Sequence, residues 1–161
     1  MFEAEAQKIK DIFGDELVDI HHIGSTSVPG LQAKPIIDIM PVVKDIDKID
    51  SFNKQMEGLG YESMGEFGMK GRRYFRKGGD DRTHQVHVFQ VDNKEDIHRH
   101  LAVRDYLRTH DEEMKKYGAL KKTLPNNSRR TLKLIWTVKT RLFKSWNEKR
   151  CAGTKRASQR R

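Results

Sequence analysis

Three small polar residues and one carboxylate form the first group that could do chemistry. Gly24, Ser25 and Thr26 follow an apolar, strand-like segment, and Asp38 interrupts the next apolar run. A strand that ends in Gly-Ser turns sharply and presents amide and hydroxyl donors, which suit phosphate oxygens. A carboxylate on the adjoining strand could hold a divalent cation against those phosphates. The pattern predicts a phosphate-binding turn beside a catalytic Asp38. The alternative is a polar turn whose neighbouring carboxylate caps local backbone.

Histidines offer a second set of ligands near Asp38. His22 precedes the Gly-Ser turn, and His84 and His87 lie in a later alternating segment. Imidazole and carboxylate together suit zinc, manganese or iron better than magnesium. His84 and His87 are three residues apart, so a regular strand points them to opposite faces, and we expect His87 to join Asp38. Asp38, His87 and His22 are therefore the candidate ligands of a divalent metal (Mn, Zn or Mg). The alternative is that these histidines are packed and hydrogen-bonded.

Basic side chains near these residues could neutralise a phosphate. Lys34 lies between the Gly-Ser turn and Asp38, and Arg73 belongs to a short strand-like segment further along the chain. A lysine ammonium or a planar arginine fork binds phosphate oxygens. We therefore predict that Lys34 and Arg73 contact the phosphate of a ligand. Arg104 and Arg108 share one face of a later helical pattern, where a structural ion pair of Arg104 or Asp105 that locks the helix to the sheet is the simpler interpretation.

Hydrophobic periodicity assigns these residues to an α/β (α+β) fold. Helical spacing is expected in five parts of the chain, at residues 2–13, 45–60, 95–110, 111–124 and 128–148. Strands are predicted where apolar residues alternate or run together, at residues 17–23, 35–43, 72–77 and 83–91. The segment 35–43 is apolar on both faces, which is typical of a central strand. The expected architecture is a mixed β-sheet flanked by helices, with C-terminal helices covering one face.

Length and composition favour a single domain in the cytoplasm. The chain has 161 residues, of which 35% are hydrophobic and 34% charged, enough to build one compact core. Its longest apolar run is far short of the roughly 20 residues that cross a bilayer. The first residues carry acids rather than the basic-then-apolar layout of a secretory signal. A single cysteine, Cys151, excludes a disulfide framework within the chain.

Positive charge is concentrated at the C-terminal end. The net charge is +9, yet residues 1–120 hold 18 Lys/Arg against 22 Asp/Glu, whereas residues 121–161 hold 14 Lys/Arg against Glu148 alone. Residues 149–161 carry six cations and very few apolar side chains, which predicts a disordered basic tail after a domain at residues 1–148. This tail makes RNA a candidate partner, although a merely solvated tail is the simpler interpretation.

The segment from His22 to Ile39 resembles the signature of the GrpB family almost letter for letter. The usual form of that signature reads roughly E-H-I-G-S-T-A-V-P-G-L-x-x-K-P-I-I-D-I. The resemblance resumes at residues 73–78, 83–90 and 101–122. GrpB proteins resemble the nucleotidyltransferase fold, and a related domain is fused to dephospho-CoA kinase in some bacteria. The resemblance implies a nucleotidyltransferase-like sheet whose Gly-Ser turn faces a cleft of nucleotide size.

The same resemblance implies an incomplete catalytic set. Active nucleotidyltransferases carry two alternating carboxylates on the strand after Gly-Ser and a third on a later strand, because two metal ions must share them. Here Ile36 and Met40 stand two residues either side of Asp38, and the later segment 83–91 offers histidines instead of acids.

These observations favour a protein that binds a nucleotide or another phosphorylated small molecule. Whether it is an enzyme that transfers a nucleotidyl group stays open, because the carboxylate set is incomplete. Two other hypotheses belong to different classes of function. One is a non-catalytic accessory or protein-interaction module, and the other is RNA binding through the basic C-terminal end.

Overall fold

The computed structural model describes residues 1–31, 34–123, 137–138, 140–141, 143–145 and 148. The chain divides into two compact units, Met1–Ile97 and His98–Arg161. In the part of the chain just given, no helix is both long enough and apolar enough to cross a membrane.

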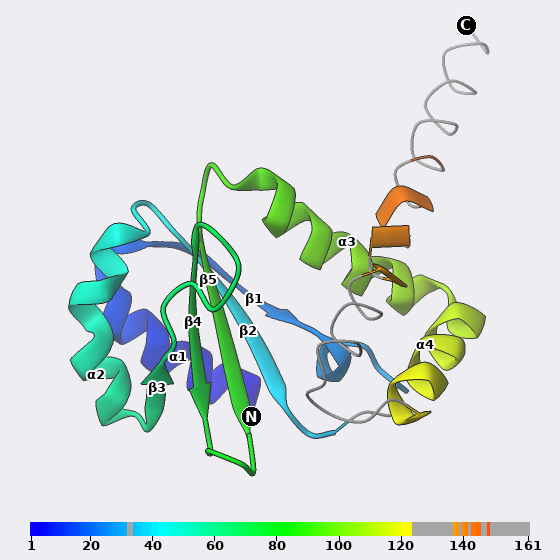
Figure 1. Cartoon of the computed structure of the whole chain (residues 1–161), viewed down its shortest axis with the longest axis horizontal. Helices are drawn as coiled ribbons and strands as arrows, with labels where there is room; N and C mark the ends of the chain where they lie inside the picture. Colours follow the sequence, from blue (N-terminus) through cyan, green and yellow to red (C-terminus); the bar gives the residue numbers. More distant parts are fainter. Residues whose placement is uncertain (32–33, 124–136, 139, 142, 146–147, 149–161) are drawn as a thin grey trace, which may run out of the picture. The chain divides into compact units, whose positions relative to one another are not determined.

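A five-stranded mixed sheet forms the centre of the first unit (Figure 1). Its strands, in chain order, are β1 Leu17–Ile23, β2 Ile37–Val43, β3 Tyr61–Ser63, β4 Arg72–Lys77 and β5 His84–Gln90. In space their order is β1-β2-β5-β4-β3. The neighbours β2 and β5 run parallel, and the other three pairs are antiparallel. The predicted mixed sheet is confirmed, with β2 between two neighbours as expected of a central strand.

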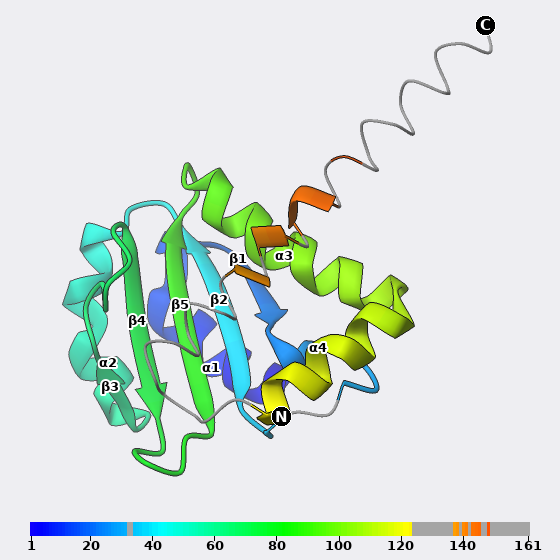
Figure 2. The ribbon, with the colours of Figure 1, turned by 45° about the vertical axis from the view of Figure 1, so that its right-hand side comes forward.

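Two helices of the first unit lie against one face of this sheet (Figure 2). They are α1 Phe2–Phe13 and α2 Asn53–Gly58, the latter preceded by a 3-10 helix at Asp47–Phe52. Ala6, Ile9 and Phe13 recur at helical spacing on α1, and all three are buried. Ile9 and Phe13 share a core with Ile39 of β2 and other apolar side chains of the sheet. Burial of this apolar stripe is what holds α1 on the sheet.

Residues 45–60, predicted as one helix, instead form a 3-10 helix followed by a short α-helix. Short polar side chains explain the difference, because they compete for backbone groups. The Asp45 carboxylate accepts a hydrogen bond from the Asp47 amide at 3.0 Å, and the Ser51 hydroxyl donates to the Lys48 carbonyl at 2.6 Å. The chain therefore tightens here before the α-helix begins at Asn53.

Strand β2 divides its side chains between the two faces of the sheet. Ile37, Ile39 and Val43 belong to the core shared with α1 and α2, whereas Asp38 and Met40 alternate with them. The ladder to β5 pairs Ile39 with Val86 and resumes at Val42 and Phe89. Pro41 lies between these two parts of the ladder, and it has no N–H to donate to β5.

The second unit contains most of α3, Lys94–Thr109, and α4, Asp111–Thr123. Acids occupy the first turn of α4 and lysines its last turn, an arrangement that complements the helix dipole. The expected helix at 128–148 and the basic tail at 149–161 fall largely or wholly outside the described residues. Within 128–148, the described residues are helical. Arg104 forms an ion pair with Asp105 at 2.8 Å within α3 itself, so the expected pair between this helix and the sheet stays a prediction.

Candidate ligand-binding site

The turn after β1 lies directly on the carboxylate of β2. Gly24 has a φ of 72°, and the Ser27 hydroxyl and amide return to its carbonyl at 2.6 and 3.3 Å. A Cβ built on Gly24 would collide with the Asp38 carboxylate, which leaves room only for a glycine there. Gly24 thus permits both the turn and the close contact with the Asp38 carboxylate, because it has no side chain. The Gly-Ser turn and Asp38, separate in sequence, form one site.

Asp38 is paired with His87 across the parallel strands β2 and β5. The His87 Nε2 lies 3.4 Å from the Asp38 Oδ1, at the long end of the range for a hydrogen bond. The Asp38 side chain is 20% exposed and that of His87 is 13% exposed. His84 lies on the opposite face, as the alternation predicts, with its ring edge against Tyr61. The carboxylate is therefore held by one histidine while part of it remains open to solvent.

Arg72, which is not among the predicted site residues, lies next to His87. Its NH1 is 3.4 Å from the His87 Nδ1, and its other nitrogens donate to the carbonyls of Glu66 and Phe67. Burial lowers the pKa of Arg72, and its guanidinium lies 5.0 Å from the centre of the Tyr74 ring. A signal for this residue existed. Arg72 and Arg73 are adjacent on a strand, so one of them must share the face of Tyr74 and His87.

The structure places His22 and Thr26 away from the Asp38 side chain. His22 is opposite Ile39 in the ladder and stacks on Phe2 of α1, with ring centres 4.7 Å apart. It therefore lies on the helix-covered face. Its Nε2 is 3.0 Å from the Thr26 hydroxyl, which donates to the Ile36 carbonyl at 3.1 Å. These hydrogen bonds of His22 and Thr26 hold the turn in place through contacts that do not involve the Asp38 side chain.

Of the remaining predicted residues, Lys34 is exposed just before β2, and Ser25 is buried at the turn. Arg73 lies on the face opposite Asp38. It binds the Asp50 carboxylate through Nε at 2.7 Å and reaches Asp47 at 3.2 Å. The hydrogen bond to Asp50 raises the pKa of Arg73. Asp38, Gly24 and His87 thus meet, whereas the Arg73 side chain ties β4 to the 3-10 helix.

The predicted metal ligands do not come together as a set of three. Asp38 and His87 contact each other, but His22 lies on the other face of the sheet. Among the residues that the structure describes, no group of three or more His, Cys, Asp or Glu side chains could hold a metal ion. Asp38 and His87 together supply two protein ligands, fewer than the roughly three or four of a typical zinc site, so the predicted divalent-metal site stays a prediction.

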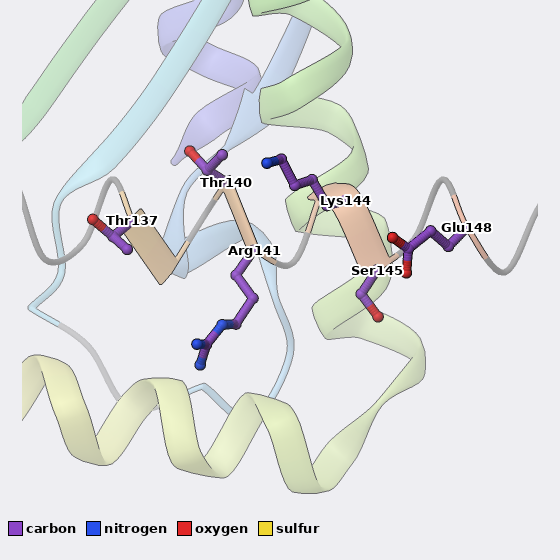
Figure 3. A pocket seen from close by; sticks show the side chains of 6 residues that line it. All are labelled: Thr137, Thr140, Arg141, Lys144, Ser145 and Glu148. Atoms are coloured by element: carbon purple, nitrogen blue, oxygen red, sulfur yellow. The ribbon is translucent and has the colours of Figure 1, made fainter.

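A pocket of about 390 Å³ lies elsewhere, in the second unit, and Figure 3 shows its lining. Among the described residues, the side chains that line it are Thr137, Thr140, Arg141, Lys144, Ser145 and Glu148. Arg141 and Lys144 point in opposite directions, so the two cations do not converge on one ligand (Figure 3). None of the residues predicted to do chemistry lines this pocket.

Fold and site together define a mixed α/β protein with a Gly-Ser turn over a single acidic residue. The family model described as GrpB protein matches residues 1–149, and the chain belongs to that family. A crystal structure of the conserved protein GrpB from Enterococcus faecalis is similar to it, with a TM-score of 0.82 and 46% identity. That similarity covers 90% of this chain and 92% of the other.

Curated relatives support the same assignment. The UPF0157 protein YqkA of Bacillus subtilis is 50% identical over 123 residues, which are 76% of this chain and 36% of YqkA. The glutamate-rich protein GrpB of Alkalihalophilus pseudofirmus is 32% identical over 129 residues, 77% of this chain and 74% of that protein. The chain thus spans about a third of the length of YqkA.

Proposed function

We propose that this protein binds a nucleotide or another phosphorylated small molecule at the Gly24 turn and Asp38. The observation that carries the proposal is the contact between them. Gly24 lies against the Asp38 carboxylate so closely that no side chain fits between the two. The turn and a partly open carboxylate then lie side by side, and in this proposal amides at the start of the turn serve the acceptor groups of the ligand while the carboxylate serves its donor groups.

Charge and family resemblance support a phosphorylated ligand. Lys34 is exposed at the start of β2, the end of that strand at which Asp38 lies. A lysine there supplies a cation for phosphate oxygens while the turn supplies amides. The nucleotidyltransferase-like fold implied by the GrpB signature agrees with a nucleotide as the ligand. Arg73 is not needed for this proposal, because its ion pairs with Asp50 and Asp47 account for it.

We propose binding without rapid nucleotidyl transfer. A two-metal mechanism requires carboxylates that bridge the ions. The position two residues after Asp38 is Met40, which is fully buried, and the interior of β5 carries no acid. Loss of these groups removes electrostatic stabilisation of the transition state but leaves the turn intact. Pyrophosphate release from nucleoside triphosphates should therefore be slow or undetectable, and rapid release that depends on Asp38 would contradict this.

Isothermal titration calorimetry with ATP tests the binding, and the two lysines that flank β2 provide a matched pair. Lys34→Gln should weaken binding several-fold, because an exposed ion pair with phosphate contributes roughly 1 kcal/mol. Lys44→Gln removes an equally exposed lysine at the other end of the strand and should change nothing. Equal losses in the two variants would place the phosphate elsewhere. No binding of any nucleotide at millimolar concentration would favour the accessory-module hypothesis.

A further inference from the structure

The side chain of His87 has both ring nitrogens engaged, and their partners differ in kind. Nδ1 faces Arg72 and Nε2 faces Asp38, each at 3.4 Å. An arginine can only donate hydrogen bonds, and an ionised carboxylate can only accept them. Nδ1 must therefore accept from Arg72, and the proton of the neutral ring must lie on Nε2, where it is donated to Asp38.

Arg72 is fixed in the position that imposes this arrangement. It is 9% exposed, and it donates to the carbonyls of Glu66 and Phe67 at 3.2 and 2.8 Å. Phe67 has a φ of 44° and its ring stacks on Tyr74, so the loop before β4 is held in one conformation at this point. The guanidinium cannot turn away from His87 without breaking these bonds. It acts on Asp38 only through the histidine.

This proton arrangement bears on the kind of ligand that Asp38 can take. A metal ion needs a lone pair from imidazole. In His87 the Nδ1 lone pair accepts from Arg72, and Nε2 carries the proton. The pair beside Asp38 therefore presents a hydrogen-bond donor and a carboxylate, rather than two metal ligands. Part of the carboxylate is open, since the Asp38 side chain is 20% exposed.

We propose that Asp38 is the acceptor for a hydroxyl group of the ligand rather than a ligand of a divalent cation. His87 donates to Oδ1 and orients the carboxylate, the part of the carboxylate that is open to solvent accepts the hydroxyl, and Arg72 is the positioning residue that fixes the histidine tautomer. The inference rests on the proposed function, because the hydroxyl is then one of the ribose hydroxyls of the nucleotide. It differs from the proposed function in stating which part of the ligand Asp38 binds.

The tautomer can be measured without any ligand. In the full-length protein labelled with ¹⁵N-histidine, long-range ¹H–¹⁵N spectra separate protonated from unprotonated ring nitrogens, and His87→Gln assigns the signals. We expect Nε2 of His87 to be protonated and Nδ1 unprotonated. Arg72→Met should weaken this preference, because Asp38 alone then favours the proton on Nε2, and Arg72→Lys, which can still donate to Nδ1, should retain more of it. Any other protonation pattern in the wild type would overturn the proposal.

Two titrations separate a hydroxyl acceptor from a metal ligand. With Mn²⁺ alone, electron paramagnetic resonance of the free ion should reveal no site that Asp38→Asn removes. ATP should bind about ten-fold or more tightly than 2′,3′-dideoxyATP, because a hydrogen bond to a charged group is lost with the hydroxyls. Asp38→Asn should erase that preference. A micromolar Mn²⁺ site lost in Asp38→Asn would overturn the inference.

The outcomes distinguish this inference from the proposed function. Absence of ATP binding would contradict the proposed function, and the histidine spectrum together with the Mn²⁺ titration would then decide the tautomer and the metal. Binding of ATP with equal affinity for its dideoxy analogue would preserve the proposed function and overturn the hydroxyl acceptor alone.

Discussion

At the scale of the residue, both the backbone conformation of Gly24 and its contact with Asp38 require a glycine. A φ of 72° already favours glycine, and the contact with Asp38 excludes every other side chain. We predict that Gly24→Ala destabilises the fold by roughly 2–4 kcal/mol, from backbone strain and from displacement of the carboxylate. Urea unfolding of the variant and the wild type gives the difference directly.

Gly68→Ala is the matched control for this substitution. Gly68 has a φ of 79°, but nothing lies within 4 Å of a Cβ built there. It should therefore cost only the strain, about 1 kcal/mol. In an Asp38→Ala background the cost of Gly24→Ala should fall, since the collision with the carboxylate is gone and only the Cβ of residue 38, at 3.0 Å, stays close. Equal costs for Gly24→Ala and Gly68→Ala in the wild-type background would contradict the contact.

The sequence predicted part of this site. Strand alternation explains which residues could be placed and which could not. The sequence placed His87 rather than His84 beside Asp38, because side chains three apart on a strand face opposite ways. It could not tell Arg72 from Arg73, since adjacent residues look alike until the register with β5 is known. Nor did it place His22, whose contact with Phe2 depends on where α1 packs.

At the scale of the element, a buried ion pair joins α1 to β4. Glu5 is 5% exposed, and its carboxylate accepts from Lys77 at 2.7 Å and from Lys8 at 3.2 Å. Burial acts to raise the pKa of Glu5, but the hydrogen bonds from Lys77 and Lys8 outweigh it and hold the pKa below its ordinary value of 4.5. The pair fixes the position of the helix on the sheet.

We predict that Glu5→Gln destabilises the protein by roughly 1–3 kcal/mol at pH 7, because Lys77 loses its carboxylate partner. Stability from Glu5 is present in full above pH 4.5 and is lost as the pH falls through the lower folded pKa. The variant should therefore lose less stability than the wild type as the pH falls from 6 to 3. Urea unfolding at several pH values measures both effects.

Glu3→Gln on the same helix serves as the control, since Glu3 is exposed and should change the stability by less than about 0.5 kcal/mol. An acid transition of the same depth in Glu5→Gln and wild type would show that the ion pair does not contribute.

The elements themselves were largely predictable. Apolar spacing located α1, β1, β2, β4, β5, α3 and α4 closely, because each buries a clear stripe or face. The 3-10 helix at Asp47–Phe52 was not predicted, since hydrogen bonds from Asp45 and Ser51 decide its conformation. The parallel pairing of β2 and β5 was also beyond the sequence, because it depends on a long connection.

At the scale of the whole molecule, the uneven distribution of charge is the main feature. Fourteen of the 32 Lys and Arg residues lie in residues 121–161. We predict that a chain ending at Glu148 keeps its urea midpoint and elutes from heparin at clearly lower salt, because six cations are lost with residues 149–161.

The hypothesis that the C-terminal end binds RNA is tested with the same truncated chain. Affinity for RNA should then fall steeply with salt and disappear with the truncation. Unchanged elution from heparin, or RNA binding by the shortened chain that does not depend on salt, would place the polyanion-binding surface elsewhere in the protein.

The most direct test of the central claim is to map ATP onto the labelled protein by ¹H–¹⁵N correlation spectra. The proposed function predicts that ATP shifts the amides of the Gly24–Ser27 turn, Lys34 and Asp38, and that Asp38→Asn weakens these changes together. Shifts confined to the segment that lines the pocket at 137–148, or no shifts at millimolar ATP, would contradict it.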